Sequence, residues 1–243
     1  GDDAGARALR LPSSAHVIRY GIDDADARLR ARDLRAWDGC TRFAVAYDDQ
    51  VVAEAALQVP GRHNVRNALA AIASGILLGA DPVRLCEGLA GFTGVERRFQ
   101  RLGEAGGVSV VDDYAHHPSE IAATLQAARE LFPGRRLLAA FQPHLYTRTR
   151  DFHAEFGQAL AAADLVLLTE IYAAREQPIP GVTAALVREA AERAGGAVAW
   201  VGARDALAGA LADAVRPGDV VLTLGAGDIT RTGPELLGRL AGA

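Results

Sequence analysis

The 243-residue sequence contains no lysine, so all 26 of its basic residues are arginine. A P-loop requires a lysine that reaches the terminal phosphates of a nucleotide. This chain therefore holds no P-loop and is not a complete P-loop enzyme. It also contains no methionine. We therefore expect that residue 1 is not a natural start and that the chain is part of a longer protein.

Other features are scarce, and each scarcity excludes a class of protein. The only two cysteines, Cys40 and Cys86, lie far apart in the sequence. They fit neither a disulfide framework nor a metal motif, which favours idle thiols and a cytoplasmic location. No apolar run is long enough to span a membrane, and no signal-peptide pattern is present. The net charge is −4 without a basic block, so we predict neither nucleic acid nor a membrane as a partner.

The first 90 residues predict a hairpin followed by two helices. Residues 41–61 alternate apolar and polar side chains on either side of a turn at Asp48 and Asp49. A helix of residues 82–89 is expected before the segment "GFTGVERRF", residues 91–99, which has the glycines of a domain linker. The first of the two helices lies between the hairpin and residue 82. It has an apolar stripe at helical spacing, formed by Val65, Leu69, Ile72 and Ile76.

From about residue 98 the pattern becomes a regular alternation of strands and helices. The expected strands are 107–111, 136–141, 165–169, 197–201 and 220–224, and they are almost continuously apolar. The expected helices are 118–132, 147–163, 182–194, 205–215 and 234–240. This alternation predicts an α/β fold with a Rossmann-like, doubly wound and mostly parallel sheet. We place the domain boundary between residues 93 and 94.

Polar segments follow four of these strands, at the ends where parallel sheets bind ligands. They read "DDYAHH", "FQPHLYTRTR", "TEIYAAREQPIPG" and "LGAGDIT" in chain order. Four consecutive strand ends with reactive side chains indicate a binding site more strongly than any one of them. The glycines of "GAGD" are weak evidence alone, because glycines after a strand often only form the turn.

The stretch "DDYAHHPSE" has two readings. Pro118 suits the first position of a helix, and the Asp and His residues before it could serve only as helix caps. Alternatively, a carboxylate here accepts hydrogen bonds from ribose hydroxyls, beside histidines that face an anion. A metal site is the less attractive choice, because adjacent histidines after a strand point apart.

Two other segments carry candidate ligands. Arg148 and Arg150 fall at a helix start, where the helix dipole favours anions, so we expect them to receive a carboxylate or phosphate together. Solvated surface arginines are the alternative. Asn64 and Asn67 share one helical face, and their amides match the hydrogen-bonding edge of adenine. Either asparagine could instead be a cap.

Six segments together resemble the Mur ligase family. They are "GRHNVRNALAAI", "GVERRF", "DDYAHHPSEI", "FQPHLYTRTRDF", "EIYAAREQPIPGV" and "LTLGAGDIT". The resemblance runs from about Gly61 to the end and more loosely from residue 1. It implies an ATP-dependent ligase with UDP-binding, P-loop and C-terminal Rossmann-like domains. The chain corresponds to the end of the P-loop domain, residues 1–93, and the whole C-terminal domain, residues 94–243.

Within the family, the motif "FQPHLYTRT" resembles the members that join L-alanine to UDP-N-acetylmuramate through an acyl phosphate, with ATP and Mg²⁺. The resemblance implies an ATP site made of His63, Asn64, Asn67, Arg98, Asp113 and Tyr114. It implies contacts to the amino acid from His116, His144, Arg148 and Arg150. Of these, His116 and Arg148 lie at the reacting groups. No residue is assigned as a metal ligand.

One departure from the family pattern is Leu145, which stands where many members have an arginine. We expect the isolated chain to be inactive, since much of the catalytic equipment belongs to the absent part. Three alternatives remain open at this stage: a non-catalytic nucleotide-binding module, a metal-dependent phosphoesterase built on the Asp/His cluster, and a related ligase for another amino acid or peptide. The oligomeric state is not predicted.

Overall fold

The computed structural model describes residues 1–37 and 40–242. Contacts divide the chain into two compact units, Gly1–Gly94 and Val95–Ala243. The division falls inside the glycine-containing segment 91–99. Across the described residues, no helix combines the length and the apolar character that crossing a membrane requires.

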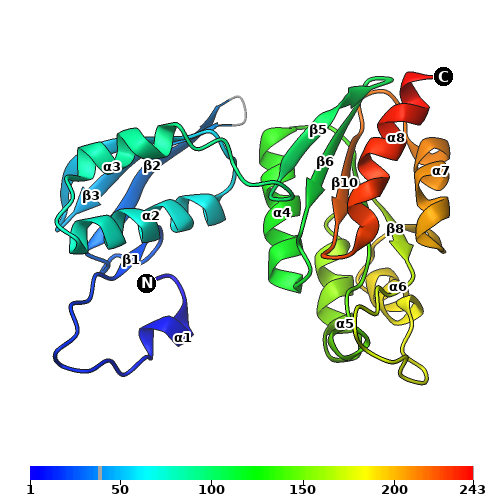
Figure 1. Ribbon diagram of the computed structural model, residues 1–243, viewed down its shortest axis with the longest axis horizontal. Helices are drawn as coiled ribbons and strands as arrows, with labels where there is room; N and C mark the ends of the chain where they lie inside the picture. The colour runs from blue at the N-terminus through cyan, green and yellow to red at the C-terminus, as the bar shows by residue number, and fades with distance from the viewer. Residues whose placement is uncertain (38–39, 243) are drawn as a thin grey trace. The chain divides into compact units, whose positions relative to one another are not determined.

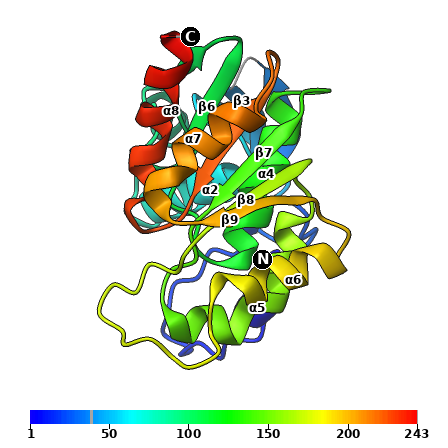
Figure 2. The same cartoon turned by 90° about the vertical axis from the view of Figure 1, so that its right-hand side faces the viewer.

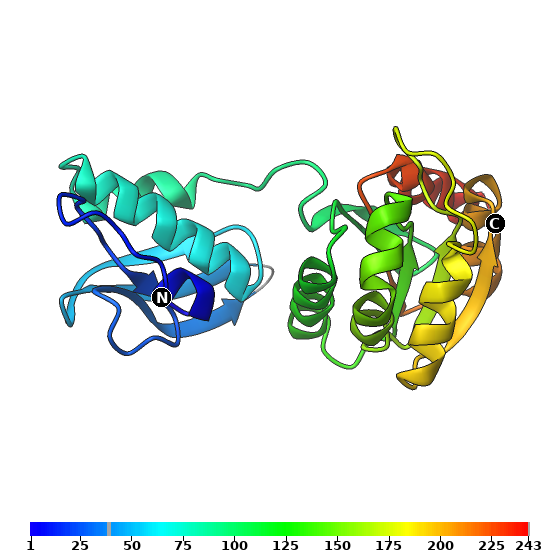
Figure 3. The ribbon, with the colours of Figure 1, turned by 90° about the horizontal axis from the view of Figure 1, so that it is seen from below.

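The first unit is a four-stranded sheet covered by helices. The strands occur in the order β1 (Tyr20–Gly21), β2 (Leu29–Trp37), β3 (Cys40–Tyr47) and β4 (Gln50–Leu57). β1 is parallel to β2, whereas β2, β3 and β4 are antiparallel. The helices are α1 (Ala4–Arg7), α2 (Arg62–Leu77) and α3 (Pro82–Ala90). Figure 3 shows α2 and α3 on the same side of the blue sheet.

The predicted hairpin is confirmed as β3 and β4. Tyr47 pairs with Gln50 across a two-residue turn, and both turn residues, Asp48 and Asp49, have positive φ values of 47° and 67°. This is the type I′ geometry that matches the twist of antiparallel strands. Asp48 also accepts two hydrogen bonds of 2.7 Å from Arg28, so the carboxylate ties the turn to the residue before β2.

The predicted apolar stripe of α2 is also confirmed. Val65, Leu69 and Ile72 are completely buried against the sheet, and Ile76 packs at the edge of the same core. Strand β2 was not predicted, because arginines interrupt its apolar pattern and few of its described side chains, among them Leu29, Ala31 and Leu34, contact the core.

The second unit contains the predicted doubly wound sheet. The strands are β5 (Gln100–Ala105), β6 (Val108–Asp113), β7 (Leu137–Phe141), β8 (Leu165–Thr169), β9 (Val198–Gly202) and β10 (Val220–Leu224). The helices are α4 (Pro118–Leu131), α5 (Tyr146–Leu160), α6 (Ala184–Arg193), α7 (Arg204–Ala214), the 3-10 helix η1 (Asp228–Arg231) and α8 (Thr232–Ala241). The strand order is β5-β6-β10-β7-β8-β9, and every neighbouring pair except β5 with β6 is parallel.

Two cores lie on the two faces of this sheet. Along β7, Leu137, Ala139 and Phe141 belong to the core beneath α4, α5 and α6. The alternate residues Leu138 and Ala140 belong to the core beneath α7 and α8. Figures 1 and 2 show these two groups of helices on opposite sides of the strands. Burial on both faces explains why these strands read as continuous apolar runs.

Strand β5 was not predicted. It is an edge strand that pairs antiparallel with β6 and is joined to it by a turn at Gly106 and Gly107, with φ values of 58° and 75°. Its sequence "QRLGEA" is largely polar because most of its side chains are exposed or half-buried. An edge strand with polar side chains lacks the apolar signal from which strands are recognised.

Candidate functional site

The polar segments predicted to meet at one edge of the sheet do so. Leu224, the last residue of β10, lies opposite both Asp113 of β6 and Phe141 of β7. Phe141 in turn lies opposite Leu168 of β8. The four strands therefore end at the same level, and the loops that follow them leave from the same edge. Beyond the strands, His144 and Tyr172 continue the pairing as an isolated parallel bridge.

The glycine loop after β10 packs against Gln142. This glutamine is almost completely buried. Its amide nitrogen donates to Asp228 at 2.8 Å, and its amide oxygen accepts the N–H of Ile229 at 3.1 Å. A Cβ on Gly225 would lie 2.9 Å from the Gln142 carbonyl oxygen, and one on Gly227 would collide with the Gln142 side chain. The glycines are thus required for close packing.

Asp113 is turned inward. Its carboxylate accepts the backbone N–H groups of Phe99 and Ala115, each at 2.8 Å, and the side chain is buried. Burial raises the pKa of this carboxyl, against the lowering effect of these two donors. Ribose hydroxyls, the ligands expected from the sequence, would have to share oxygens that already accept hydrogen bonds from the backbone. The structure therefore gives Asp113 a first role in holding Phe99 to the end of β6.

The two adjacent histidines turn to different neighbours, as expected for residues after a strand. His117 is the N-cap of α4, and it forms a capping box with Glu120, whose carboxylate accepts the N–H groups of His116 and His117 at 2.9 and 3.1 Å. The capping interpretation is therefore correct for His117. These donors, with the charges of His116 and Arg98, outweigh burial and hold the pKa of Glu120 below its usual value.

His116 faces the strand ends instead. Its Nδ1 lies 3.0 Å from the carbonyl oxygen of Tyr114. A carbonyl only accepts, so this nitrogen carries the proton, and in the neutral ring Nε2 is left as an acceptor. The ring contacts the rings of Tyr114 and His144 edge-on, at centroid distances of 5.3 and 6.2 Å. The structure thus brings together His116 and His144 from two different strand ends.

His144 is held between Tyr172 and Arg148. Its ring stacks on that of Tyr172 at 5.7 Å with an angle of 14°. The Arg148 guanidinium approaches His144 Nδ1 at 3.4 Å. Burial first, and then the charges of Arg148 and His116, lower the pKa of His144. His144 is therefore neutral at neutral pH, so Nδ1 is free to accept from Arg148 and holds the guanidinium toward the strand ends.

Arg148 and Arg150 do not lie side by side, in contrast to the expectation from the sequence. Both lie in the first turns of α5, but positions two residues apart on a helix point about 200° away from each other. Arg148 is half-buried beside His144, whereas Arg150 is exposed and pairs with its neighbour Asp151 at 2.7 and 3.2 Å. Only Arg148 belongs to the cluster at the strand ends.

The anion expected at the start of α5 is supplied by the chain itself. The N-cap, Leu145, has a φ of 72° and no side-chain acceptor. The Glu176 carboxylate, from the loop after β8, accepts the N–H of Thr147 at 2.9 Å and also its hydroxyl. The Thr147 hydroxyl, followed by the N–H groups of Thr147 and Tyr146, lowers the pKa of Glu176. Sequence reasoning missed this residue, although a helix start without a capping side chain signals that an acceptor must come from elsewhere.

Replacing Glu176 with alanine is expected to lower the melting temperature of the chain by roughly 2–4 °C, the usual effect of a lost helix cap in a domain of this size. Cleavage by a protease in the loop of residues 170–183 should accelerate at the same time. The control is Glu155→Ala, which removes an exposed glutamate from the same helix. Equal melting temperatures for the two variants would contradict the capping role.

Two consecutive arginines flank Tyr114. Arg98, assigned to the nucleotide by the resemblance, is half-exposed, lies 5.6 Å from the centre of the Tyr114 ring and is 3.9 Å from Glu120. Arg97 lies 4.7 Å from the same ring centre and donates to backbone oxygens of the glycine loop. Arg97 was not among the residues singled out from the sequence.

The remaining candidates, His63, Asn64 and Asn67, lie at the start of α2 in the first unit. The amide of Asn64 donates to the carbonyl oxygen of Pro60 at 2.7 Å, and Asn67 is exposed. The N-cap of α2 is Gly61, so neither asparagine has the capping role considered above. These three residues belong to a different unit from the strand-end cluster.

The acidic and histidine side chains do not converge on a metal ion. Within residues 1–37 and 40–242, no group of three or more His, Cys, Asp or Glu is arranged to hold one. The two aspartates nearest the strand ends, Asp112 and Asp113, are buried and already accept hydrogen bonds from the protein. These residues therefore do not fit a Mg²⁺ ion held by protein ligands.

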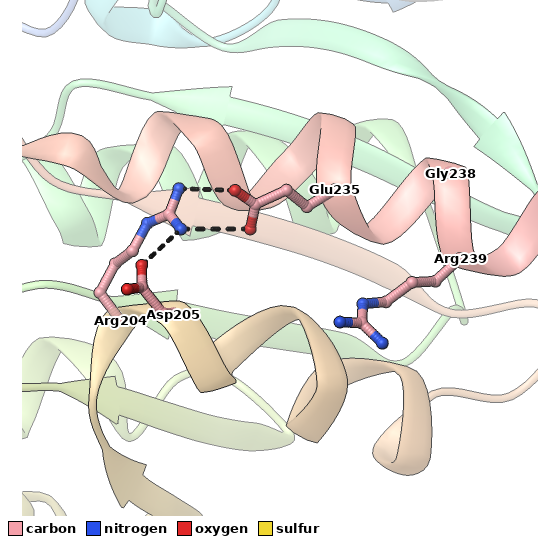
Figure 4. Close-up of a pocket in the computed structure, with 5 residues that line it drawn as sticks. All are labelled: Arg204, Asp205, Glu235, Gly238 and Arg239. Carbon is pink, nitrogen blue, oxygen red and sulfur yellow. Dashed lines mark hydrogen bonds and ion pairs between the residues drawn. The ribbon is translucent and has the colours of Figure 1, made fainter.

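A surface pocket lies between α7 and α8. It is lined by Arg204, Asp205, Glu235, Gly238 and Arg239 (Figure 4). Arg204 donates to both carboxylate oxygens of Glu235, at 2.8 and 3.3 Å, and to Asp205 at 3.0 Å. Its guanidinium is thus occupied in joining the two helices.

Comparison with known proteins agrees with this architecture. Residues 97–227 match the Mur ligase glutamate ligase domain, and residues 1–75 match the Mur ligase middle domain. The chain is 51% identical over 243 residues to a UDP-N-acetylmuramate–L-alanine ligase of Kineococcus radiotolerans, covering 99% of this chain and 51% of the relative. A ligase of the same name from Cutibacterium acnes is 50% identical over 247 residues, covering 99% of this chain and 52% of the relative.

Solved structures give the same relationship. The UDP-N-acetylmuramate-alanine ligase of Thermotoga maritima superposes with a TM-score of 0.76 and 30% identity, covering 91% of this chain and 47% of that one. A murein peptide ligase of Psychrobacter arcticus superposes with a TM-score of 0.66 and 25% identity, covering 93% and 46%. The chain spans about half the length of the curated relatives that it matches. More than half of the residues of this chain match one Mur ligase domain, and its first 75 residues match a second. This chain therefore belongs to the Mur ligase family.

Proposed function

We propose that this chain is the second half of an ATP-dependent ligase that joins L-alanine to UDP-N-acetylmuramate in peptidoglycan synthesis. Gly1–Gly94 would be the end of the ATP-binding middle domain, and Val95–Ala243 the domain that brings the amino acid. The observation that carries the proposal is the convergence of His116, His144 and Arg148 at the ends of β6 and β7. The names of the relatives at 50–51% identity support the choice of alanine.

The proposed reaction has two steps. The carboxylate of UDP-N-acetylmuramate attacks the γ-phosphate of ATP, which gives an acyl phosphate and ADP. The amine of L-alanine then attacks the acyl carbon, and the tetrahedral intermediate expels phosphate to leave the amide. Mg²⁺ would enter bound to the ATP phosphates, where it offsets their charge.

Within this chain, Arg148 would receive the carboxylate of alanine. A guanidinium can hold a carboxylate through two parallel hydrogen bonds, and this fixes the direction in which the amine points. Because His144 holds Arg148 from one side, the guanidinium is oriented before the substrate arrives. In the neutral form of the His116 ring, Nε2 is positioned to accept a hydrogen bond or a proton at the reacting end.

The residues proposed to contact ATP are His63, Asn64 and Asn67 for the adenine, with Tyr114 and Arg98 also proposed for the nucleotide. Asp113 would act mainly by holding Phe99, and so Arg98 beside it, at the end of β6. Arg150, paired with Asp151, is not retained as a ligand of the amino acid.

The test is phosphate release by the full-length protein with ATP and UDP-N-acetylmuramate, with and without L-alanine. We expect release that requires alanine, and none from the 243-residue chain alone. Nucleotide binding without any effect of an amino acid would favour a binding module. Stimulation by another amino acid or a peptide, but not by alanine, would identify a different member of the family. Hydrolysis of a phosphoester by the isolated chain with a divalent metal would favour the phosphoesterase.

A further inference from the structure

Arg97 has an unusual backbone conformation at the start of the second unit. Its φ of 59° is in the left-handed region, which residues with a side chain rarely adopt. Two hydrogen bonds hold it there: its N–H donates to the Gln100 side chain at 2.9 Å, and its carbonyl oxygen accepts the N–H of Tyr114 at 2.6 Å. As a result, Arg97 turns toward the protein and Arg98 toward solvent, with side-chain exposures of 24% and 53%.

The side chain of Arg97 joins three segments that are far apart in the sequence. Its guanidinium donates to the carbonyl oxygens of Gly225 at 2.6 Å and Gly227 at 3.1 Å. Its Nε lies 3.4 Å from the carboxylate of Asp112, an ion-pair distance. Asp112 is completely buried and also accepts the hydroxyl of Thr230 at 2.8 Å. One guanidinium therefore connects the start of the second unit to the end of β6 and to the glycine loop.

Only an arginine can make this set of contacts. The planar guanidinium carries five donors in a fixed fork, so it can serve two carbonyl oxygens and face a carboxylate at the same time. A lysine keeps the charge beside Asp112, but it places that charge at a single atom. Substitution by lysine therefore keeps a positive charge beside the buried Asp112 carboxylate but removes the two hydrogen bonds to the glycine loop.

We propose that Arg97 is a positioning residue for the nucleotide. It fastens residues 97–100 to the glycine loop after β10, and so sets where Arg98 and Tyr114 meet ATP. Its ring contact with Tyr114 at 4.7 Å and its backbone bond to the same residue make this coupling direct. The proposal rests on the proposed ligase function and extends it, because Arg97 acts on the ATP side while Arg148 acts on the alanine side.

The first test is kinetic and uses the full-length protein with Arg97→Lys. We expect the KM for ATP to rise roughly tenfold, as for loss of one hydrogen bond to a charged group, while the KM for alanine changes by less than about twofold. Arg101→Lys is the matched control. Arg101 lies four residues after Arg97 in the sequence, and its exposed side chain packs over the Phe132 ring. Unchanged ATP kinetics in Arg97→Lys would overturn the proposal. So would equal losses in every kinetic parameter together with a lower melting temperature, the result expected of a merely structural residue.

The second test does not depend on ligase activity. In the 243-residue chain, amide hydrogen exchange is measured at Tyr114, whose N–H donates to Arg97, and at Leu138 in the middle of β7. Arg97→Lys should accelerate exchange at Tyr114 by roughly tenfold or more and leave Leu138 unchanged. Equal protection of Tyr114 in wild type and variant would overturn the positioning role, even if the ligase function is correct. If alanine-dependent phosphate release is absent, this measurement still decides whether Arg97 positions Tyr114.

Discussion

Replacing Arg148 with alanine is expected to raise the KM for L-alanine by roughly 30-fold to 1,000-fold in the full-length protein. Loss of one partner from a desolvated, hydrogen-bonded charge pair costs about 2–4 kcal/mol, and each 1.4 kcal/mol corresponds to a tenfold change. Arg148 is half-buried and its guanidinium is oriented by His144, so the substrate carboxylate would meet it partly shielded from water. The KM for ATP should remain near its wild-type value. The measurement is alanine-dependent phosphate release over a range of alanine concentrations.

Arg150→Ala is the matched control for Arg148→Ala. It removes an arginine from the same helix, two positions away, that is exposed and paired with Asp151. Alanine kinetics within about twofold of wild type are expected, since exposed ion pairs contribute little. Equal increases in the KM for alanine in both variants would show that the two arginines act together, as the sequence alone suggested. An effect on kcat without any effect on the KM for alanine would contradict the carboxylate role of Arg148.

The second large effect is expected for Gly157→Ala, which should lower the free energy of unfolding by about 2–3 kcal/mol. Gly157 lies in α5 where this helix crosses α6, and an added Cβ would be 2.5 Å from the Cβ of Ala190 and from the nitrogen of Ala191. Backbone atoms cannot turn aside as a flexible side chain can. The two helices would have to separate, which opens the packing of Phe156 and Leu160 below them. Urea denaturation followed by circular dichroism measures the change.

Gly209→Ala in α7 is expected to change the free energy of unfolding in the opposite direction. Nothing lies within 4 Å of an added Cβ there, and alanine in a helix interior is favoured over glycine by about 0.5–1 kcal/mol. We therefore expect Gly209→Ala to raise the free energy of unfolding. Both substitutions improve helix propensity, so a difference in sign isolates the close contact between α5 and α6. Stabilisation by Gly157→Ala would mean that the helices are further apart than the structure places them.

Most strands and helices of the second unit were predictable, because burial on both faces makes each inner parallel strand a nearly continuous apolar run. Residues 220–224 were predicted as a strand with the bounds that β10 has, and helix α4 was predicted to begin at Pro118, as it does. Strands β2 and β5 were not predictable in this way. Their polar side chains face solvent, and they are strands because a neighbouring strand provides hydrogen-bond partners.

The location of the candidate site at one edge of the sheet was also predictable, because parallel strands end on the same side. The assignments of individual residues were less so. Local sequence placed Arg148 and Arg150 together at a helix start, but the turn of the helix separates them. It placed Asp113 toward a ligand, whereas the backbone N–H groups of Phe99 and Ala115 take its oxygens.

The α/β architecture, the family resemblance and the group of loops that carry the polar residues could all be read from the sequence. These follow from periodicity along the chain and from short motifs, both of which are local. Which side chains converge became known from the folded structure: Arg148 with His144, His144 with His116, Glu176 with the start of α5, and Arg97 with the glycine loop. Most of these contacts join segments that are far apart in the sequence, up to 130 positions, whereas Arg148 meets His144 four residues away through the direction in which the start of α5 turns. Their formation depends on strand order and helix rotation rather than on neighbouring letters.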